Sequence, residues 1–278
     1  MKIKTSAKLN LNLEIKNKNS SSLHEISSLI VPIDLYDEID IVQNEEGFDQ
    51  IHFDEYPHLS KESTIHKALI CLRTHIPVEN FFDIRIKKII PLEAGLGGGS
   101  SDAAGVLKSI SKILDISLPD NLTIAQEVGS DVPFFINGKP GIIKNVGDEI
   151  EDYDIEQEMF FLIIVPSFGM STKAVFDEWD NIRSENVDTE KVPFDNKFII
   201  FNDALKVVNR LKPELEILKK KIEQNIERKV FMTGTGSTLF AIFDTQVEAE
   251  NAKEAVNIDN RLILVTKKID YSYKELFD

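Results

Sequence analysis

Cysteine is almost absent from this sequence of 278 residues, in which Cys71 is the only one. A single cysteine excludes an intramolecular disulfide, and a cysteine-based zinc site would need ligands of other types. Cys71 lies in the apolar run 68–72, which favours a buried position on a helix. The thiol is therefore expected to pack in a core.

Long hydrophobic runs are also missing. The apolar run near the middle of the chain covers only residues 160–165, far short of the roughly 20 residues needed to cross a bilayer. Residues 1–6 lead into an alternating segment, unlike the apolar core of a signal peptide. These features predict a cytoplasmic protein with no membrane partner.

Positive charge is scarce, because 32 Lys and Arg residues stand against 47 Asp and Glu residues, for a net charge of −15. Such an acidic chain has no electrostatic footprint for nucleic acid and is repelled by anionic lipid. We therefore expect a small-molecule partner. An anionic ligand would have to be bound by local backbone N–H groups and a few cations.

The length and composition predict a globular protein of two domains, since 278 residues exceed the usual size of one hydrophobic core. Strands and helices alternate without a solenoid or heptad repeat. The predicted class is α+β. We place the domains at residues 1–155 and 156–278, with the join near 150–160.

Hydrophobic periodicity predicts the main elements. Residues 7–15 alternate strictly between apolar and polar, as in a strand, and Ile65, Leu69, Leu72 and Ile76 follow helical spacing. The other predicted strands are 38–42, 83–89, 160–165, 230–232, 239–243 and 261–269. The other predicted helices are 102–114, 121–128, 197–211, one that begins at Pro213, and 248–256. The polar stretch 180–191 is expected to form a surface loop or insertion.

The strongest local signal is the glycine-rich loop Gly95–Ser101, with four glycines in five positions. Glycines remove the Cβ atoms that would keep backbone N–H groups away from a phosphate, and the following helix directs its positive end to the same place. Ser100 and Ser101 can cap that helix or offer hydroxyls to a phosphate or a metal ion. The loop therefore indicates phosphate binding.

Three other interpretations of this loop are less favoured. A Walker loop requires Gly-Lys-Ser/Thr, whereas Gly99 is followed by two serines. A dinucleotide fingerprint needs glycine at its sixth position, where Ser100 stands, and an acidic residue that ends a strand. A flexible linker is rarely followed at once by an amphipathic helix.

Three further segments carry candidate residues that do not decide the function alone. Lys8 shares a strand face with Asn10 and Asn12, which is either a solvated edge or part of a site. Asp131, between a helix end and an apolar run, is either a capping or turn residue or a general base in a partly dry site. Residues 234–237 form a small-residue turn that a ligand can approach closely.

Taken together, these segments resemble the GHMP kinase superfamily. The resemblance is carried in order by Ala7–Leu11, Pro91–Ala104 and Gly234–Ser237, and it runs from about residue 4 to 243. It implies a ribosomal-protein-S5-like N-terminal domain and a ferredoxin-like C-terminal domain. Residues 129–135, with matches at His24-Glu25, Ser171-Thr172 and Asn202-Asp203, are similar to the branch that phosphorylates the erythritol part of a cytidine-diphosphate substrate in the synthesis of isoprenoid precursors.

The resemblance implies a transfer of phosphoryl from ATP, with Mg²⁺ partly neutralising the phosphates. Asp131 would take the proton of the acceptor hydroxyl, and Lys8 would keep Asp131 ionised and stabilise charge on the phosphate. Ser101 is a candidate metal ligand. The phosphates would be bound by Pro91, Gly95, Leu96, Gly97, Gly98, Gly99, Ser100 and Ser101. The acceptor would be bound by Asn10, His24, Phe168, Thr172 and Gly234.

Two positions depart from the family pattern. Leu23 stands where the family has a tyrosine that stacks on cytosine, and Phe168 is expected to supply the opposite aromatic platform. Residues 62–65 replace an Asp-Asn-Leu motif near the adenine. Two alternatives therefore stay open, namely a GHMP-type kinase for a different small alcohol and a catalytically silent ligand sensor on the same fold. The sequence does not set the oligomeric state.

Overall fold

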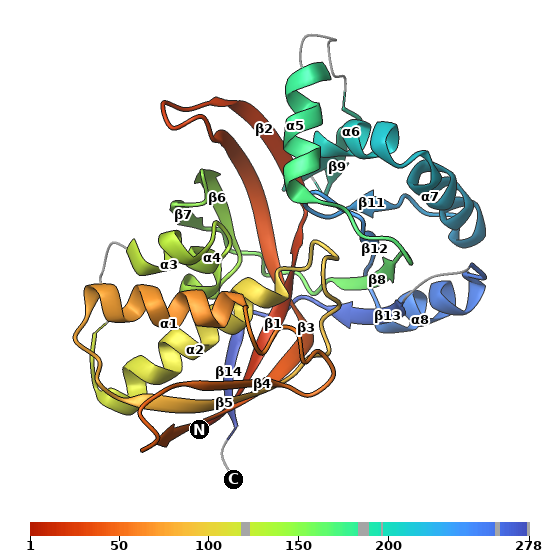
Figure 1. Ribbon diagram of the computed structural model, residues 1–278. Coiled ribbons are helices and arrows are strands. Elements are labelled where there is room, and N and C mark those ends of the chain that lie inside the picture. Colours follow the sequence, from red (N-terminus) through yellow and green to blue (C-terminus); the bar gives the residue numbers. More distant parts are fainter. Residues whose placement is uncertain (118–122, 183–188, 196, 259–261, 277–278) are drawn as a thin grey trace.

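The computed structural model describes residues 1–117, 123–182, 189–195, 197–258 and 262–276. Figure 1 shows two groups of helices on either side of a central set of strands, and Lys2 near the start of the chain pairs with Leu276 near its end. The described residues form a ten-stranded and a four-stranded sheet.

The larger sheet is organised by one long strand. It pairs antiparallel with β1, β2, β5 and β6, and β4 lies parallel to β5. Its strands from the first part of the chain are β1 (Lys2–Asn10), β2 (Asn12–Lys18), the long β3 (His24–Asn44), β4 (Gln50–Phe53), β5 (Phe81–Lys87), β6 (Gly141–Asn145) and β7 (Glu149–Asp152).

Three strands from the second part of the chain complete this sheet. They are β9 (Val192–Phe194), β10 (Phe198–Asn202) and β14 (Tyr273–Leu276). β14 lies antiparallel to β1, and β10 lies parallel to β2. A domain boundary at residue 155 stays a prediction, and any such division is crossed by these strand pairs.

Four helices pack with this sheet around the first core. Ile3, Ile39 and Ile84 from strands β1, β3 and β5 meet Leu69 and Val106 from the helices, all of them at most 2% exposed. The helices are α1 (Thr64–His75), α2 (Gly98–Leu114), α3 (Thr123–Val128) and α4 (Val132–Asn137). This core fixes the start of α2, where the glycine-rich loop ends.

The smaller sheet is covered on both faces. In β8, Leu162 and Ile164 pack against helices in a second core, whereas Phe161 and Ile163 pack against Leu9 of β1 and its neighbours. Both faces being covered explains why residues 160–165 are apolar throughout. The sheet order is β11 (Phe231–Met232), β12 (Leu239–Phe243), β8 (Phe160–Val165) and β13 (Leu262–Lys267), all antiparallel. The helices are α5 (Thr172–Ile182), α6 (Ala204–Leu211), α7 (Pro213–Ile226) and α8 (Gln246–Ala255).

Several sequence predictions are confirmed, and others need correction. The strands at 160–165 and 239–243 and the helix from Pro213 are present as predicted. The predicted strand 7–15 is two strands that separate at Leu11, because alternation reports the two faces of an extended chain but not a bend within it. The helix after the glycine-rich loop begins at Gly98, four residues before the predicted Asp102.

The predicted helix 197–211 is wrong in its first part. Residues 198–202 form β10, which pairs with β2 and β9, and the helix begins only at Ala204. Tertiary pairing with β2 therefore overrides local periodicity. The stretch 180–191 is not wholly a loop, because α5 continues to the buried Ile182. Residues 183–188, 121–122 and 261 of the predicted elements lie outside the described residues.

None of the described helices is long and apolar enough to cross a membrane.

Candidate active site

Strand β1 connects two loops that are far from it in sequence. The backbone N–H of Lys8 donates to the Leu96 carbonyl in the glycine-rich loop (3.0 Å), and the N–H of Asn10 donates to Oγ1 of Thr233 (2.8 Å). A Cβ atom on Gly95 would lie 2.9 Å from the Gly236 carbonyl oxygen, so these backbones approach too closely for a larger residue. The three motif segments of the sequence therefore meet in one place.

Contacts with neighbouring segments fix the glycine-rich loop at the start of α2. Gly97 is the N-cap residue of α2 with φ +74°, and a Cβ on it would lie 2.9 Å from the Phe135 ring and 3.0 Å from Cγ of Lys8. Oγ1 of Thr64 donates to the Gly99 carbonyl (2.7 Å). The first N–H groups of a helix have no partner within it, so this end of α2 is suited to bind an anion.

Two cavities lie on either side of this loop. One has a volume of about 580 Å³, and its lining includes Pro91, Gly95, Leu96, Gly97, Gly98, Gly99 and Ser100. The other, of about 480 Å³, is lined by Lys8, Asn10, His24, Asp131, Thr172 and Gly234, among others. We call them the donor cavity and the acceptor cavity. Gly95 and Gly97 line both, so the loop is the wall that they share.

Lys8 and Asp131 face each other in the acceptor cavity beside this wall. The Lys8 ammonium lies 3.5 Å from Oδ2 of Asp131, and the two side chains are 5% and 29% exposed. The ammonium also donates to Oδ1 of Asn10 (2.5 Å), whose Nδ2 donates to Ser28 (2.8 Å). The polar face of β1 is therefore buried at Lys8 and Asn10, which excludes the alternative of a solvated strand edge.

The carboxylate of Asp131 does not stabilise the helix that it precedes. Asp131 is the N-cap residue of α4, yet its side chain makes no capping hydrogen bond to that helix. A cap of this kind usually stabilises a helix by about 1 kcal/mol, and here that interaction is not used. The carboxylate is instead directed to Lys8 and the acceptor cavity.

The outer part of the acceptor cavity is built by β2, β3 and α5. Nε2 of His24 lies 3.0 Å from Oδ1 of Asp180, and the Lys18 ammonium lies 2.5 Å from Oδ2 of the same carboxylate. These contacts, the one with Lys18 first, lower the pKa of Asp180 below its usual value. The Phe176 ring stacks on the His24 ring, with 5.2 Å between centroids and 21° between planes.

Two of the residues predicted from the sequence lie away from these cavities. Phe168 does not line the acceptor cavity, because its ring packs with the second core and lies 5.9 Å from the Lys212 ammonium. Ser101 is only 2% exposed and does not line the donor cavity, whereas Ser100 does. All other predicted site residues line the donor or the acceptor cavity.

Sequence reasoning missed Phe176, Asp180 and Lys18. The signal for the first two was present, because Val175, Trp179 and Ile182 follow helical spacing and place Phe176 and Asp180 together on the other side of the same helix. Lys18 carried no signal, since its partner is more than 150 residues away.

A buried ionic cluster supports the start of α2 from below. The Lys88 ammonium contacts Asp37 and lies 2.8 Å from Asp102, and all three side chains are at most 2% exposed. Thr5 also donates to Asp102 (2.8 Å). Burial raises the pKa of Asp102 to about 7; the charge of Lys88 lowers it in part, and the charge of Asp37 raises it. The Asp102 carboxyl beneath the loop is therefore expected to bind a proton at a higher pH than an ordinary carboxyl.

Comparison with known proteins agrees with this geometry. Residues 63–139 match the family model of the GHMP kinases N terminal domain, and residues 198–261 match that of the GHMP kinases C terminal. The glycine-rich loop and Asp131 fall within the first match, whereas Lys8 precedes it. The fold and the site thus define a GHMP kinase, which takes ATP as its phosphoryl donor.

Full-length relatives narrow the class. A 4-diphosphocytidyl-2-C-methyl-D-erythritol kinase of Clostridium beijerinckii is 30% identical, with 97% of this chain and 100% of the relative covered. One of Pseudoalteromonas translucida is 31% identical over 88% of this chain and 85% of the relative. The chain therefore belongs to the family of 4-diphosphocytidyl-2-C-methyl-D-erythritol kinases within the GHMP kinases.

Solved structures share the fold over nearly the whole chain. A crystal structure of 4-(cytidine 5'-diphospho)-2C-methyl-D-erythritol kinase superposes with a TM-score of 0.77 at 24% identity, with 96% of this chain and 99% of that chain covered. A homoserine kinase from Cytophaga hutchinsonii superposes with a TM-score of 0.70 at 15% identity, with 99% and 96% covered.

Proposed function

We propose that this enzyme transfers the γ-phosphoryl group of ATP to the 2-hydroxyl of 4-diphosphocytidyl-2-C-methyl-D-erythritol. The observation that carries the proposal is the shared glycine wall, with Lys8 and Asp131 beside it. A phosphoryl group held on one side of that wall and a hydroxyl held on the other would meet at these two side chains.

In the donor cavity, the amides at the start of α2 would bind the phosphates of ATP. This arrangement suits a protein of net charge −15, because backbone dipoles and Lys8 supply positive potential locally. Phosphoryl transfer relies mainly on positioning and on stabilising the charge of the transferred group. Pro91, Gly95, Leu96, Gly97, Gly98, Gly99 and Ser100 would form this cradle.

Asp131 would act as the general base. The acceptor oxygen bonds to the γ-phosphorus, the bond from that phosphorus to the bridging oxygen of ADP breaks, and the hydroxyl proton passes to the Asp131 carboxylate. Lys8 would stabilise negative charge on the transferred group, while Asn10 holds the Lys8 ammonium in place.

At this site Mg²⁺ would be held mainly by the phosphates of ATP. Among the described residues no group of three or more His, Cys, Asp or Glu side chains could hold a metal ion. Mg²⁺ bound to nucleotides usually takes only one or two protein ligands. The hydroxyl of Ser101 stays a proposed ligand, and its burial at the start of α2 means that the loop would have to expose it.

The acceptor would be recognised by its flat base and by its hydroxyls. Phe176, stacked on His24, offers an aromatic face of the kind on which nucleobases stack. Thr172, joined to Thr235 by a hydroxyl contact of 3.0 Å, and Gly234 would line the part nearer to the reacting hydroxyl. Leu23, 57% exposed at the edge of the cavity, supplies an apolar contact where a second aromatic platform is absent. We further propose that the enzyme works in the cytoplasm.

An acceptor panel tests the proposal. ADP release is followed with ATP and, in parallel, 4-diphosphocytidyl-2-C-methyl-D-erythritol, mevalonate or homoserine. We expect kcat/KM to be at least a thousandfold higher for the cytidine-diphosphate alcohol. Equal or better turnover of another alcohol would assign the enzyme to a different acceptor, and ATP hydrolysis without any acceptor dependence would contradict a kinase site here.

A further inference from the structure

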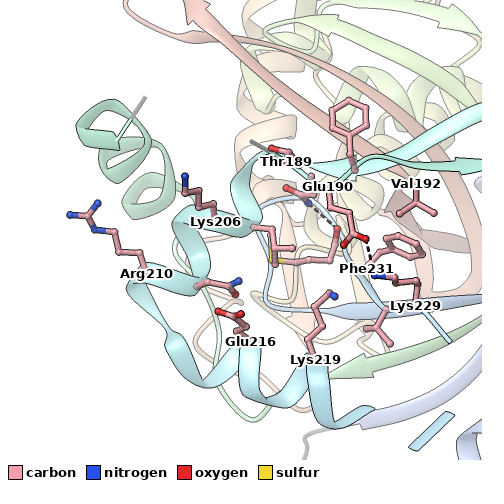
Figure 2. A pocket seen from close by; sticks show the side chains of 15 residues that line it. Thr189, Glu190, Val192, Lys206, Arg210, Glu216, Lys219, Lys229 and Phe231 are labelled. Carbon is pink, nitrogen blue, oxygen red and sulfur yellow. Dashed lines mark hydrogen bonds and ion pairs between the residues drawn. The ribbon is translucent and has the colours of Figure 1, made fainter. Parts of the chain in front are cut away.

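A third cavity, of about 460 Å³, shares no lining residue with either cavity of the active site. It is an open cavity lined mainly by residues of β10, α6, α7 and β11 (Figure 2). We propose that this cavity is a second binding site, for a small anion that carries an apolar group, and that its occupancy changes the affinity of the acceptor cavity. The proposed kinase activity makes no use of it.

The cavity gathers positive charge on a strongly acidic protein. Four cationic side chains line it against two acidic ones, although the whole chain carries −15. Figure 2 shows the ammonium groups of Lys219 and Lys229 directed toward its middle from different sides, while Lys206 and Arg210 extend away. The cations are Lys206, Arg210, Lys219 and Lys229, and the acids are Glu190 and Glu216.

The two inward ammonium groups can accept an anion at low cost. Lys229 pairs with Glu190 at 2.7 Å, but these side chains are 55% and 64% exposed. An exposed pair of this kind stabilises a protein by about 0–1 kcal/mol, so an incoming anion can replace Glu190. Lys219 is only 14% exposed and donates to Glu223 (2.7 Å), which leaves two of its three N–H donors for a ligand.

The floor of the cavity indicates that the ligand also carries an apolar group. It consists of apolar side chains from both sheets and from α6, namely Val192, Phe201, Leu205, Val230, Phe231 and Met232. A free inorganic anion would leave this surface uncovered, whereas an apolar group attached to a phosphate, carboxylate or sulfonate would cover it. The cavity therefore fits an amphipathic anion.

Asn202 connects this cavity to the active site. Its side chain lines the cavity, is 6% exposed, and donates from Nδ2 to the carbonyls of Met232 and Gly234, both at 2.8 Å. Its Oδ1 accepts from the N–H of Ala204, the first residue of α6. The same amide thus holds the start of α6 and the turn that lines the acceptor cavity.

The turn at residues 234–236 packs closely against its neighbours on both sides. A Cβ on Gly236 would lie 2.8 Å from the sulfur of Met232, which lines the third cavity, and a Cβ on Gly234 would lie 3.1 Å from Oδ1 of Asn10. A ligand that moves Met232 or Asn202 therefore moves the turn against Lys8 and Asn10. By linkage, an acceptor bound in the active site must change the affinity of the third cavity by the same factor.

Binding is tested with the fluorescent anion 8-anilinonaphthalene-1-sulfonate and the full-length enzyme, with a non-hydrolysable ATP analogue occupying the donor cavity. We expect saturable fluorescence that phenyl phosphate displaces. The variant Lys219→Ala/Lys229→Ala should bind the probe at least tenfold more weakly, and Leu205→Trp, which fills the cavity, should abolish the displaceable signal. Lys221→Ala is the matched control, because Lys221 is an exposed cation on α7 that does not line the cavity.

Equal probe affinity in all of these variants would overturn the site. If the double variant melts early, Lys229→Ala alone, which removes an exposed side chain, should still weaken binding of the probe about threefold.

The kinetic arm, which rests on the proposed function, measures the KM of the acceptor with and without saturating phenyl phosphate. We expect a change of at least fivefold that disappears in Leu205→Trp; an unchanged KM would overturn the coupling. The binding arm needs no acceptor, so its failure is distinct from a wrong acceptor.

Discussion

The donor and acceptor cavities share a wall but are built in different ways. The donor cavity is lined mainly by one contiguous segment, residues 91–100, and its binding groups are backbone amides at a helix start. The acceptor cavity is lined by side chains from β1, β2, β3, α5 and the turn at 234–235. The two surfaces meet at Gly95 and Gly97, which line both cavities, and Lys8 lies on the acceptor side beside them.

This difference separates the binding of the triphosphate, which is general, from the recognition of one acceptor, which is specific. A cradle of amides binds any triphosphate in the same way, and it is defined by glycines that a single stretch of sequence can contain. Recognition of one acceptor needs several side chains at fixed relative positions, and these come together only in the folded chain. Substitutions on the two sides should accordingly affect different kinetic constants.

The largest effect is expected where the two cavities meet. Asp131→Asn should lower kcat by about 10²- to 10⁴-fold, the usual contribution of a positioned general base. The KM for ATP should change little, because Asp131 does not line the donor cavity. ADP release measures both constants, and thermal melting shows whether the variant is folded. A folded variant with normal kcat would remove Asp131 from the mechanism.

The next effect should fall on the acceptor side alone. Phe176→Ala removes the aromatic face that stacks on His24, which is comparable to the loss of base stacking of roughly 1–3 kcal/mol. We expect the KM of the acceptor to rise about 5- to 150-fold, with the KM of ATP unchanged. Phe168→Ala is the control, since its ring lies outside the cavity. A larger effect from Phe168 than from Phe176 would reverse the assignment.

A smaller effect is expected on the donor side. Gly97→Ala places a Cβ 2.9 Å from the Phe135 ring in a backbone with φ +74°, so the loop must shift. We expect kcat/KM for ATP to fall about tenfold, which corresponds to about 1.4 kcal/mol of strain. Gly47→Ala has a similar φ of +81° and nothing within 4 Å, so it should leave the kinetics unchanged. If both variants behave alike, the crowding around Gly97 is irrelevant.

The smallest effect concerns the cluster beneath the donor loop. The folded pKa of Asp102, about 7, exceeds the ordinary 3.8, so the folded state binds more protons than the unfolded state between these values. The free energy of unfolding should therefore fall as the pH rises from about 4 to about 7. Asp102→Asn removes this titration. Denaturant unfolding of both proteins at pH 5, 6 and 7.5 should show a weaker pH dependence in the variant; identical slopes would contradict the raised pKa of Asp102.

The sequence predicted the donor side more completely than the acceptor side, because one contiguous segment lines the donor cavity whereas distant segments line the acceptor cavity. Glycines directly before a helix predict a phosphate-binding loop from one short segment. Seven of the eight predicted phosphate-binding residues line the donor cavity. Phe176 and Lys18 gain their positions from contacts across more than 150 residues. Phe168 was predicted from its place in the chain, but its ring turns into the second core.

The fold shows the same division between local and distant information. The strand at 160–165 and the helix from Pro213 follow from apolar patterning alone. The strand β10 was predicted as a helix, because only its pairing with β2 and β9 fixes it as extended. The bend at Leu11 was missed because the alternation continues through it.

The arrangement of two cavities on one wall is tested most directly by the inhibition pattern of cytidine 5'-diphosphate. This compound carries the base and diphosphate of the proposed acceptor but lacks the hydroxyl that is phosphorylated. We predict competitive inhibition against the acceptor and non-competitive inhibition against ATP in steady-state ADP release. Competition with ATP alone, and not with the acceptor, would contradict the separation of the donor and acceptor cavities.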